Sequence, residues 1–104
     1  MSESNELTIR DNPAESRIEA DVGGAVAYAQ YRVAPGTVTF THTRVPEALR
    51  GRGIGTRLIQ AGLAMARDRG LQVIPECPFF SAYFRAHPEQ QTLLAPAGQK
   101  LPSG

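Results

Sequence analysis

The chain has 104 residues, 41% of them apolar, and eleven Lys and Arg against ten Asp and Glu give a net charge of +1. This length fits one domain and leaves no room for two, and the apolar share predicts a folded chain. The near-neutral charge and the 7% share of aromatic residues argue against nucleic acid as the partner. The single cysteine, Cys77, excludes an intramolecular disulfide.

Neither a targeting signal nor a membrane segment is visible in the sequence. The first six residues are polar and acidic, without the basic and apolar regions of a signal peptide. No apolar stretch approaches the ~20 residues that a membrane span needs. We therefore expect a cytoplasmic protein with no membrane partner. We also expect a monomer or a weak homodimer, because a parallel-strand edge near Pro75 would permit pairing.

Four segments in the first half have the alternation or the β-branched content that is typical of strands. They are residues 7–10, 16–22, 25–33 and 37–45, separated by turn signals at residues 11–13, 23–24 and 34–36. Short connections between successive strands favour an antiparallel meander. In the fourth segment a period of two predicts that one face is shared by Val38, Phe40, His42 and Arg44.

The second half changes to helical spacing. From Gly53 to about Arg69 the apolar residues fall largely on one side, which predicts a helix, and Gly70 is suited to end it. Residues 71–75 are typical of a short buried strand, and the intervening helix makes its crossover to the preceding strand parallel. Because Pro75 cannot donate a ladder hydrogen bond, this strand should end or split from its neighbour there.

A second, shorter helix is predicted over residues 79–86, closed by His87 and Pro88. Residues 95–104 contain two prolines and two glycines and are expected to form a loose tail. The predicted fold is therefore α/β (α+β), in one domain over residues 1–94. Its mixed sheet is an antiparallel meander followed by a β-α-β crossover and a short C-terminal helix.

The turn before the first predicted helix is rich in glycine, with the sequence Arg50-Gly51-Arg52-Gly53-Ile54-Gly55. Such a turn presents free backbone N–H groups at the positive end of a helix dipole, which suits a phosphate or pyrophosphate. The alternative is a tight turn with no ligand. Four arginines surround the turn, and Glu47 is the only acidic residue near them: Arg44, Arg50, Arg52 and Arg57. Charged runs are, however, more often simply solvated surface.

Two common phosphate-binding motifs do not fit this turn. A P-loop needs Lys and then Ser or Thr after its last glycine, and no Lys follows any glycine here. A dinucleotide fingerprint needs a third glycine where this chain has Thr56. The acidic residue expected about twenty positions further on is replaced by Leu71.

The turn does match [Q/R]-x-x-G-x-[G/A], through Arg50, Gly53 and Gly55. This pattern resembles the pyrophosphate-binding signature of the GNAT acetyltransferase superfamily. The resemblance extends over about residues 40–94, and it is closest to the minimal GNAT-like subfamily of short acetyltransferase domains. The segments that carry it are residues 41–46, 49–55 and 70–71, Ile74-Pro75-x-Cys77-Pro78-Phe79 and Tyr83-x-x-x-His87-Pro88.

The resemblance implies acetyl-CoA as the cofactor. It assigns the coenzyme pyrophosphate to the backbone amides of the turn and the start of the helix: Arg50, Gly51, Arg52, Gly53, Ile54, Gly55 and Thr56. It assigns the pantetheine arm to the backbone of the preceding strand, at Arg44 and Val45. The chain lacks the helices that larger relatives place between their first strands. Since those helices build part of the acceptor pocket, the acceptor site is expected to be open or completed by a partner.

Three residues are candidates for the chemistry of acetyl transfer. Cys77 follows the second parallel strand and could accept the acetyl group, or it could be a small buried apolar residue. His42 could take a proton from the amine or activate Cys77, or it could be a strand histidine bonded to neighbouring backbone. Tyr83 resembles the tyrosine that protonates the departing thiolate in GNAT enzymes, although it also belongs to an aromatic helix face. His87 most simply caps the short helix.

The leading hypothesis is an N-acetyltransferase that moves acetyl from acetyl-CoA to a small-molecule or protein amine, directly or through Cys77. The alternative is a coenzyme A or acyl-CoA binding module, or a partner subunit, without efficient transfer. The missing pocket helices and the lack of an obvious acidic base favour this alternative. No residue pattern indicates a metal site, and none identifies the acceptor amine.

Overall fold

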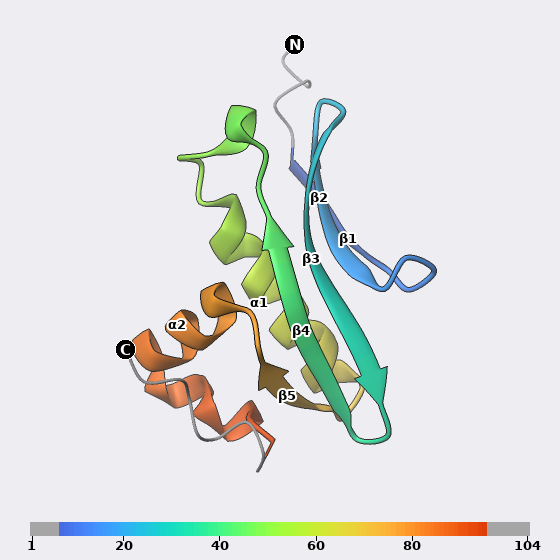
Figure 1. Ribbon diagram of the computed structural model, residues 1–104, viewed down its shortest axis with the longest axis vertical. Helices are drawn as coiled ribbons and strands as arrows, with labels where there is room; N and C mark the ends of the chain where they lie inside the picture. Colours follow the sequence, from blue (N-terminus) through green and yellow to red (C-terminus); the bar gives the residue numbers. More distant parts are fainter. Residues whose placement is uncertain (1–6, 96–104) are drawn as a thin grey trace.

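The structure, a computed structural model, describes residues 7–95. These residues form one sheet in the order β1-β2-β3-β4-β5 (Figure 1). The strands are β1 (Leu7–Asn12), β2 (Arg17–Val22), β3 (Ala25–Ala34), β4 (Thr37–Arg44) and β5 (Gln72–Pro75). The helices are η2 (Glu47–Leu49), α1 (Ile54–Asp68), α2 (Pro78–Ala86) and η3 (Pro88–Leu93). The first four strands pair antiparallel and β5 pairs parallel to β4, which confirms the expected mixed sheet.

Helix α1 covers one face of the sheet and contacts all five strands. In Figure 1 it lies behind the sheet, while α2 lies beside β5. The close approach depends on small residues, because Ala27 and Ala29 of β3 are fully buried and a Cβ on Gly62 of α1 would lie 2.9 Å from the Phe40 ring. Phe40 stacks on Phe80 of α2 with ring centroids 4.1 Å apart. This stack joins the sheet to both helices in the centre of the core.

Strand β4 contains a bulge that the sequence pattern did not reveal. Gln30 pairs with His42 but the next residue of β3, Tyr31, pairs with Phe40, so Thr41 has no partner in β3. One extra residue shifts the alternation of a strand by one position. His42 therefore faces away from α1, on the side opposite Phe40. The expectation that His42 and Arg44 share the face of Phe40 is wrong for this reason.

The first turn also lies later than predicted. Residues 11–13 were expected to turn the chain, but Asp11 and Asn12 continue β1 and pair with β2. Side-chain contacts stabilise this extension on the side of α1, where the Tyr31 hydroxyl donates to Asp11 at 2.6 Å and Arg69 donates to Asp11 at 2.6 Å. Burial, together with this hydrogen bond to Asp11, raises the pKa of Tyr31 to about 12. The phenol therefore stays protonated and continues to donate at neutral pH.

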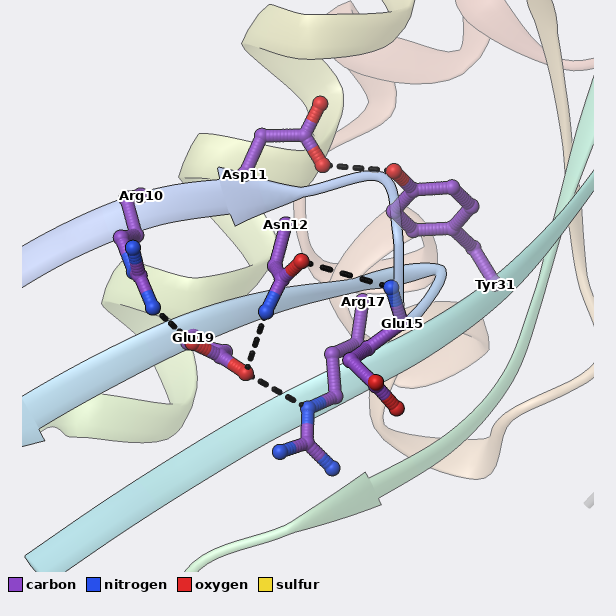
Figure 2. A network of polar contacts seen from close by, with 7 residues as sticks. All are labelled: Arg10, Asp11, Asn12, Glu15, Arg17, Glu19 and Tyr31. Carbon is purple, nitrogen blue, oxygen red and sulfur yellow. Dashed lines mark hydrogen bonds and ion pairs between the residues drawn. The ribbon is translucent and has the colours of Figure 1, made fainter.

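The other face of β1 and β2 carries a second polar cluster (Figure 2). Glu19 is buried and accepts hydrogen bonds from Arg17 at 2.7 Å, Arg10 at 3.1 Å and Asn12 at 3.1 Å. The hydrogen bond from Arg17 lowers the pKa of the Glu19 carboxyl, against the effect of burial. A buried carboxylate is stable only when it is paired and hydrogen-bonded in this way.

The end of the described chain returns to the sheet. After η3, Leu94 forms a parallel bridge with Val73, and the Ala95 N–H donates to the Val73 carbonyl at 3.0 Å. Ala95 is buried, so the loose tail does not begin there as expected, and the remaining residues 96–104 of that tail lie outside the described residues. This bridge covers the outer edge of β5 at Val73. The free parallel edge that the sequence predicted lies further along the same strand, near Pro75. Within residues 7–95 no helix is long and apolar enough to cross a membrane.

Candidate functional site

A cleft opens where β5 separates from β4. The two strands pair from Thr37 to Phe40, and the Cys77 N–H donates the last bond between them, to the Phe40 carbonyl at 2.9 Å. The strand ends at Pro75, as the missing N–H of proline predicted. Beyond Phe40, residues 42–44 of β4 have a paired strand only on the β3 side. Their other side faces the diverging chain that leads into α2.

The cleft has a volume of about 990 Å³ and lies between the end of β4, the glycine turn, the start of α1 and one side of α2. Its lining is residues 42–47, 49–51 and 53–56, Ile59, Phe79, Ala82, Tyr83, Ala86 and His87. This volume is at the upper end of the range of about 300–1,000 Å³ seen for small-molecule sites. All predicted cofactor-binding residues except Arg52 therefore line one continuous space.

The glycine turn has the backbone geometry of an anion site. Gly51 and Gly53 have φ of 81° and 71°, which side chains with a Cβ rarely adopt, and Gly53 is the N-cap of α1. The first helical hydrogen bond runs from the Arg57 N–H to the Gly53 carbonyl. No acceptor in the described chain is bonded to the amide N–H groups of residues 51–56, and the first turn carries no acidic residue. These free donors lie at the positive end of the α1 dipole.

Gly55 is required by packing rather than by its backbone angles. A Cβ on Gly55 would lie 2.9 Å from the ring of Phe79, the second residue of α2. Phe79 is 50% exposed and lines the cleft, which is unusual for a large apolar side chain in so small a domain. In the sequence Phe79 belongs to the Cys77-Pro78-Phe79 segment of the family resemblance, and no role in the site was predicted for it. The structure adds it to the wall of the cleft.

The four arginines near the turn divide into two pairs. Arg44 and Arg50 line the cleft, whereas Arg52 and Arg57 are exposed outside its lining. Arg50 donates to the Val45 carbonyl at 3.4 Å, which keeps its side chain close to the end of β4. No ion pair to a carboxylate of residues 7–95 uses any of these arginines. Their charge is therefore available to an anionic ligand.

Cys77 lies beneath the cleft rather than in its lining. Its side chain is 3% exposed, and its sulfur lies 3.2 Å from the hydroxyl of Thr43, which does line the cleft. The residue is also the N-cap of α2. Reactive cysteines are partly exposed, whereas buried ones are structural and inert. In this conformation Cys77 has the environment of a structural residue.

The other two predicted catalytic residues, His42 and Tyr83, do line the cleft. His42 is exposed, with its ring centroid 6.3 Å from that of Tyr28. Tyr83 is half-buried, and its hydroxyl has no hydrogen-bond partner among the described residues. That hydroxyl is therefore free to donate to a ligand.

His87 also lines the cleft, which the sequence analysis did not predict. Its ring stacks on that of Tyr83 with centroids 4.0 Å apart, and its Nδ1 lies 3.0 Å from the Tyr83 carbonyl. A carbonyl can only accept, so Nδ1 donates and the neutral ring keeps Nε2 as an acceptor. His87 also caps α2 as expected, since its N–H donates to the same carbonyl at 2.9 Å. The cap thus fixes the ring that supports Tyr83.

Three comparisons with known proteins agree with this geometry. A family model described as GCN5-related N-acetyltransferase matches residues 17–93. The NMR solution structure of a GCN5-like putative N-acetyltransferase from Staphylococcus aureus superposes with a TM-score of 0.67, at 28% identity and over 91% of each chain. Protein NATD1 of Xenopus tropicalis is 35% identical over 57 residues, which are 55% of this chain and 52% of that protein. The chain thus spans about half the length of this curated relative.

Proposed function

Because this chain belongs to the GCN5-related N-acetyltransferase family, we propose that it binds acetyl-CoA and transfers the acetyl group to an amine. The observation that carries the proposal is the pairing of two features in one cleft. The turn of residues 51–56 offers free amide donors at a helix N-terminus, and residues 42–44 of β4 offer an unpaired strand side a short distance along the same lining. A pyrophosphate and an amide-bearing arm need these two features.

In the proposed binding mode, successive parts of acetyl-CoA contact successive residues along the cleft. The amides of residues 51–56 donate to the pyrophosphate, and Arg50 adds positive charge beside them. The backbone of Arg44 and Val45 pairs with the amides of the pantetheine arm, as an added strand would. Phe79 provides apolar contact on the opposite wall. Together these residues direct the thioester end toward Thr43 and Tyr83.

The proposed chemistry needs two proton transfers, one from a side chain of this chain to the leaving sulfur and one from the amine to another side chain. The thioester of acetyl-CoA supplies an activated acetyl group. We assign proton donation to the departing sulfur to the Tyr83 hydroxyl, because it lines the cleft and has no partner within residues 7–95. We assign the amine proton to His42, which is the exposed imidazole of the lining on β4. The amine nitrogen then forms the new bond to the acetyl carbon as the carbon–sulfur bond breaks.

Direct transfer is favoured over an acetyl-Cys77 intermediate, because Cys77 is buried and its sulfur contacts the Thr43 hydroxyl. Incubation of the wild-type protein with acetyl-CoA, followed by intact mass measurement, is expected to give no adduct on Cys77. Cys77→Ala is expected to keep a kcat within about threefold of the wild type, since it removes no proton donor. A wild-type acetyl adduct that Cys77→Ala abolishes, together with the loss of turnover, would establish the covalent route instead.

The ligand itself is tested by thermal unfolding with acetyl-CoA, coenzyme A, ATP and NAD. A hundredfold excess of ligand over its Kd stabilises the folded state by about 2.7 kcal/mol. For a domain of this size that corresponds to a rise in Tm of about 10 °C or more. We expect this rise with acetyl-CoA and coenzyme A and a much smaller one with ATP and NAD at the same concentration. Equal stabilisation by ATP would contradict the proposal.

A non-catalytic coenzyme A binding module remains the second candidate, because within residues 7–95 no helix covers the face of the sheet opposite α1 (Figure 1). The same protein sample separates the two functions. Release of coenzyme A in the presence of a panel of amines supports the transferase. Binding of acetyl-CoA without release above the rate of spontaneous hydrolysis, across the whole panel, supports the module.

A further inference from the structure

No helix within residues 7–95 covers the face of the sheet opposite α1, and two residues that line the cleft, His42 and Arg44, lie on this uncovered face. α1 lies on one face only, and the main contacts of α2 are with α1, β5 and η3 (Figure 1). The bulge at Thr41 turns His42 and Arg44 to the uncovered face, and both still line the cleft. An acceptor that arrives from this face therefore reaches the cleft across the outer side of β4.

Four residues form a row across the uncovered face, one from each of the first four strands. Residues directly opposite each other in antiparallel strands share a face, and the register pairs them in the order Arg10, Glu19, Tyr28 and Arg44. We call this set the outer-face row. Two neighbours reinforce it, because the Arg17 guanidinium lies 4.7 Å from the Tyr28 ring centroid and the His42 ring lies 6.3 Å from it. The row leads from β1 directly to the mouth of the cleft.

The outer-face row presents positive charge to solvent. Its only carboxylate, that of Glu19, is buried and already accepts bonds from Arg10, Asn12 and Arg17 (Figure 2). Arg44 is exposed and pairs with no carboxylate of residues 7–95. The side chain of Arg10 is 67% exposed although it donates to Glu19. An anionic partner thus meets uncompensated guanidinium charge next to aromatic surface.

We infer that the acceptor is an amine carried on an acidic polypeptide segment, which lies along the outer-face row with its amine at His42. This inference rests on the proposed acetyl transfer. A polypeptide is favoured over a small molecule because the row is an open surface. Small-molecule sites bury about 70–90% of their ligand in a concave pocket, and the cleft is of a size for the coenzyme. Arg44 has no carboxylate partner within residues 7–95, and Arg10 and Arg17 share a single carboxylate. The charge complement of this surplus is a row of Asp and Glu side chains.

The test uses three peptides of equal length with one central lysine, flanked by Asp and Glu, by Asn and Gln, or by Arg and Lys. The full chain with saturating acetyl-CoA is expected to acetylate the acidic peptide with a kcat/KM about tenfold above the neutral one, which a few exposed ion pairs can supply. The difference should lie in KM, with kcat nearly equal, and should fall when salt is raised. The basic peptide should be the poorest substrate.

Variants of Arg44 decide whether the outer-face row causes the preference. Arg44→Gln should raise KM for the acidic peptide severalfold, Arg44→Lys should restore most of the loss, and Arg44→Glu should favour the basic peptide. Arg67→Gln, on the exposed side of α1, is the matched control and should leave the preference intact. The Kd for coenzyme A is measured for each variant beside the peptide kinetics, because Arg44 lines the cleft that we propose for the coenzyme.

The outcomes separate the inference from the proposed function. Transfer to small amines or to all three peptides alike would overturn the inference and leave the acetyltransferase proposal standing. An Arg44→Gln variant that weakens coenzyme A binding without changing peptide preference would assign its side chain to the coenzyme and also overturn the inference. Absence of transfer to any amine by a protein that binds acetyl-CoA would overturn the proposed function, and the inference with it.

Discussion

Replacing Tyr83 with phenylalanine is expected to lower the kcat of acetyl transfer by about a hundredfold or more, the usual contribution of a positioned general acid. The hydroxyl is the only group that the substitution removes, and it has no partner among the described residues. The ring keeps its contacts with His87 and Phe84, so the fold and the cleft wall should be unchanged. Steady-state kinetics with a fixed amine, together with the Kd for coenzyme A, measure the effect.

The pattern of parameters distinguishes acid catalysis from simple packing. Loss of a proton donor lowers kcat while the Kd for coenzyme A stays within about twofold. Tyr83→Ala removes the ring as well, and is expected to weaken coenzyme A binding and lower the Tm because His87 loses its stacking partner. Equal kcat for the wild type and Tyr83→Phe would assign Tyr83 to packing alone.

The glycine turn could be predicted from the sequence because its geometry is local. Gly51 and Gly53 have positive φ and the helix begins immediately after them, so spacing and residue type suffice to predict the conformation of the turn. The strand order followed for a similar reason, since short connections and one helical crossover leave few topologies. Pro75 likewise ended β5 by its own chemistry.

The face of the sheet on which the predicted catalytic residues lie could not be predicted from local sequence. A single unpaired residue, Thr41, reverses the alternation beyond it, and Thr41 differs in no visible way from the other threonines of β4. As a result Thr43, rather than His42, contacts Cys77. The face of the sheet that each residue of β4 occupies depends on how β4 pairs with β3, and this pairing is a tertiary property. The return of Leu94 to Val73 is tertiary for the same reason.

The same limit applies to Cys77 and Phe79. Cys77 was predicted from its position after the second parallel strand as a candidate acetyl acceptor, and no role was predicted for Phe79. In the structure Cys77 is buried beneath the cleft while Phe79 is half exposed in its wall. The helical period of α2 fixes only which residues share a side. Phe79 packs closely against Gly55 of α1, more than twenty positions earlier. The site therefore depends on packing between α1 and α2 that spacing alone does not encode.

Replacing Phe40 with alanine is expected to destabilise the fold by about 3–5 kcal/mol, the usual cost of truncating a buried phenylalanine. Phe40 is fully buried, stacks on Phe80 and contacts Tyr31 at a ring distance of 6.0 Å. A loss of this size is a large part of the roughly 5–15 kcal/mol that stabilises a typical domain. Since β5 leaves β4 at this residue, acetyl-CoA binding should weaken along with the fold.

The neighbouring Gly62 allows a sharper test through a double-mutant cycle. In the wild type, a Cβ on Gly62 would lie 2.9 Å from the Phe40 ring. Overpacking in Gly62→Ala should therefore destabilise the fold by about 1–3 kcal/mol. The better helix propensity of alanine should offset about 1 kcal/mol of this loss. In Phe40→Ala the same methyl group enters the cavity, and Gly62→Ala should stabilise by about 1 kcal/mol or more. The sign of its effect should therefore reverse between the two backgrounds.

Phe84→Ala provides the matched control for this cycle. Phe84 is as fully buried as Phe40, but it is not among the atoms nearest to the Cβ position of Gly62. Phe84→Ala should lower the free energy of unfolding by a similar amount. Its effect and that of Gly62→Ala should add in the double variant to within about 0.5 kcal/mol. Urea unfolding of the five variants and the wild type measures each free energy under one protocol. Additivity of Phe40→Ala and Gly62→Ala would mean that α1 does not lie against the Phe40 ring, and the packing that closes the floor of the cleft would have to be different.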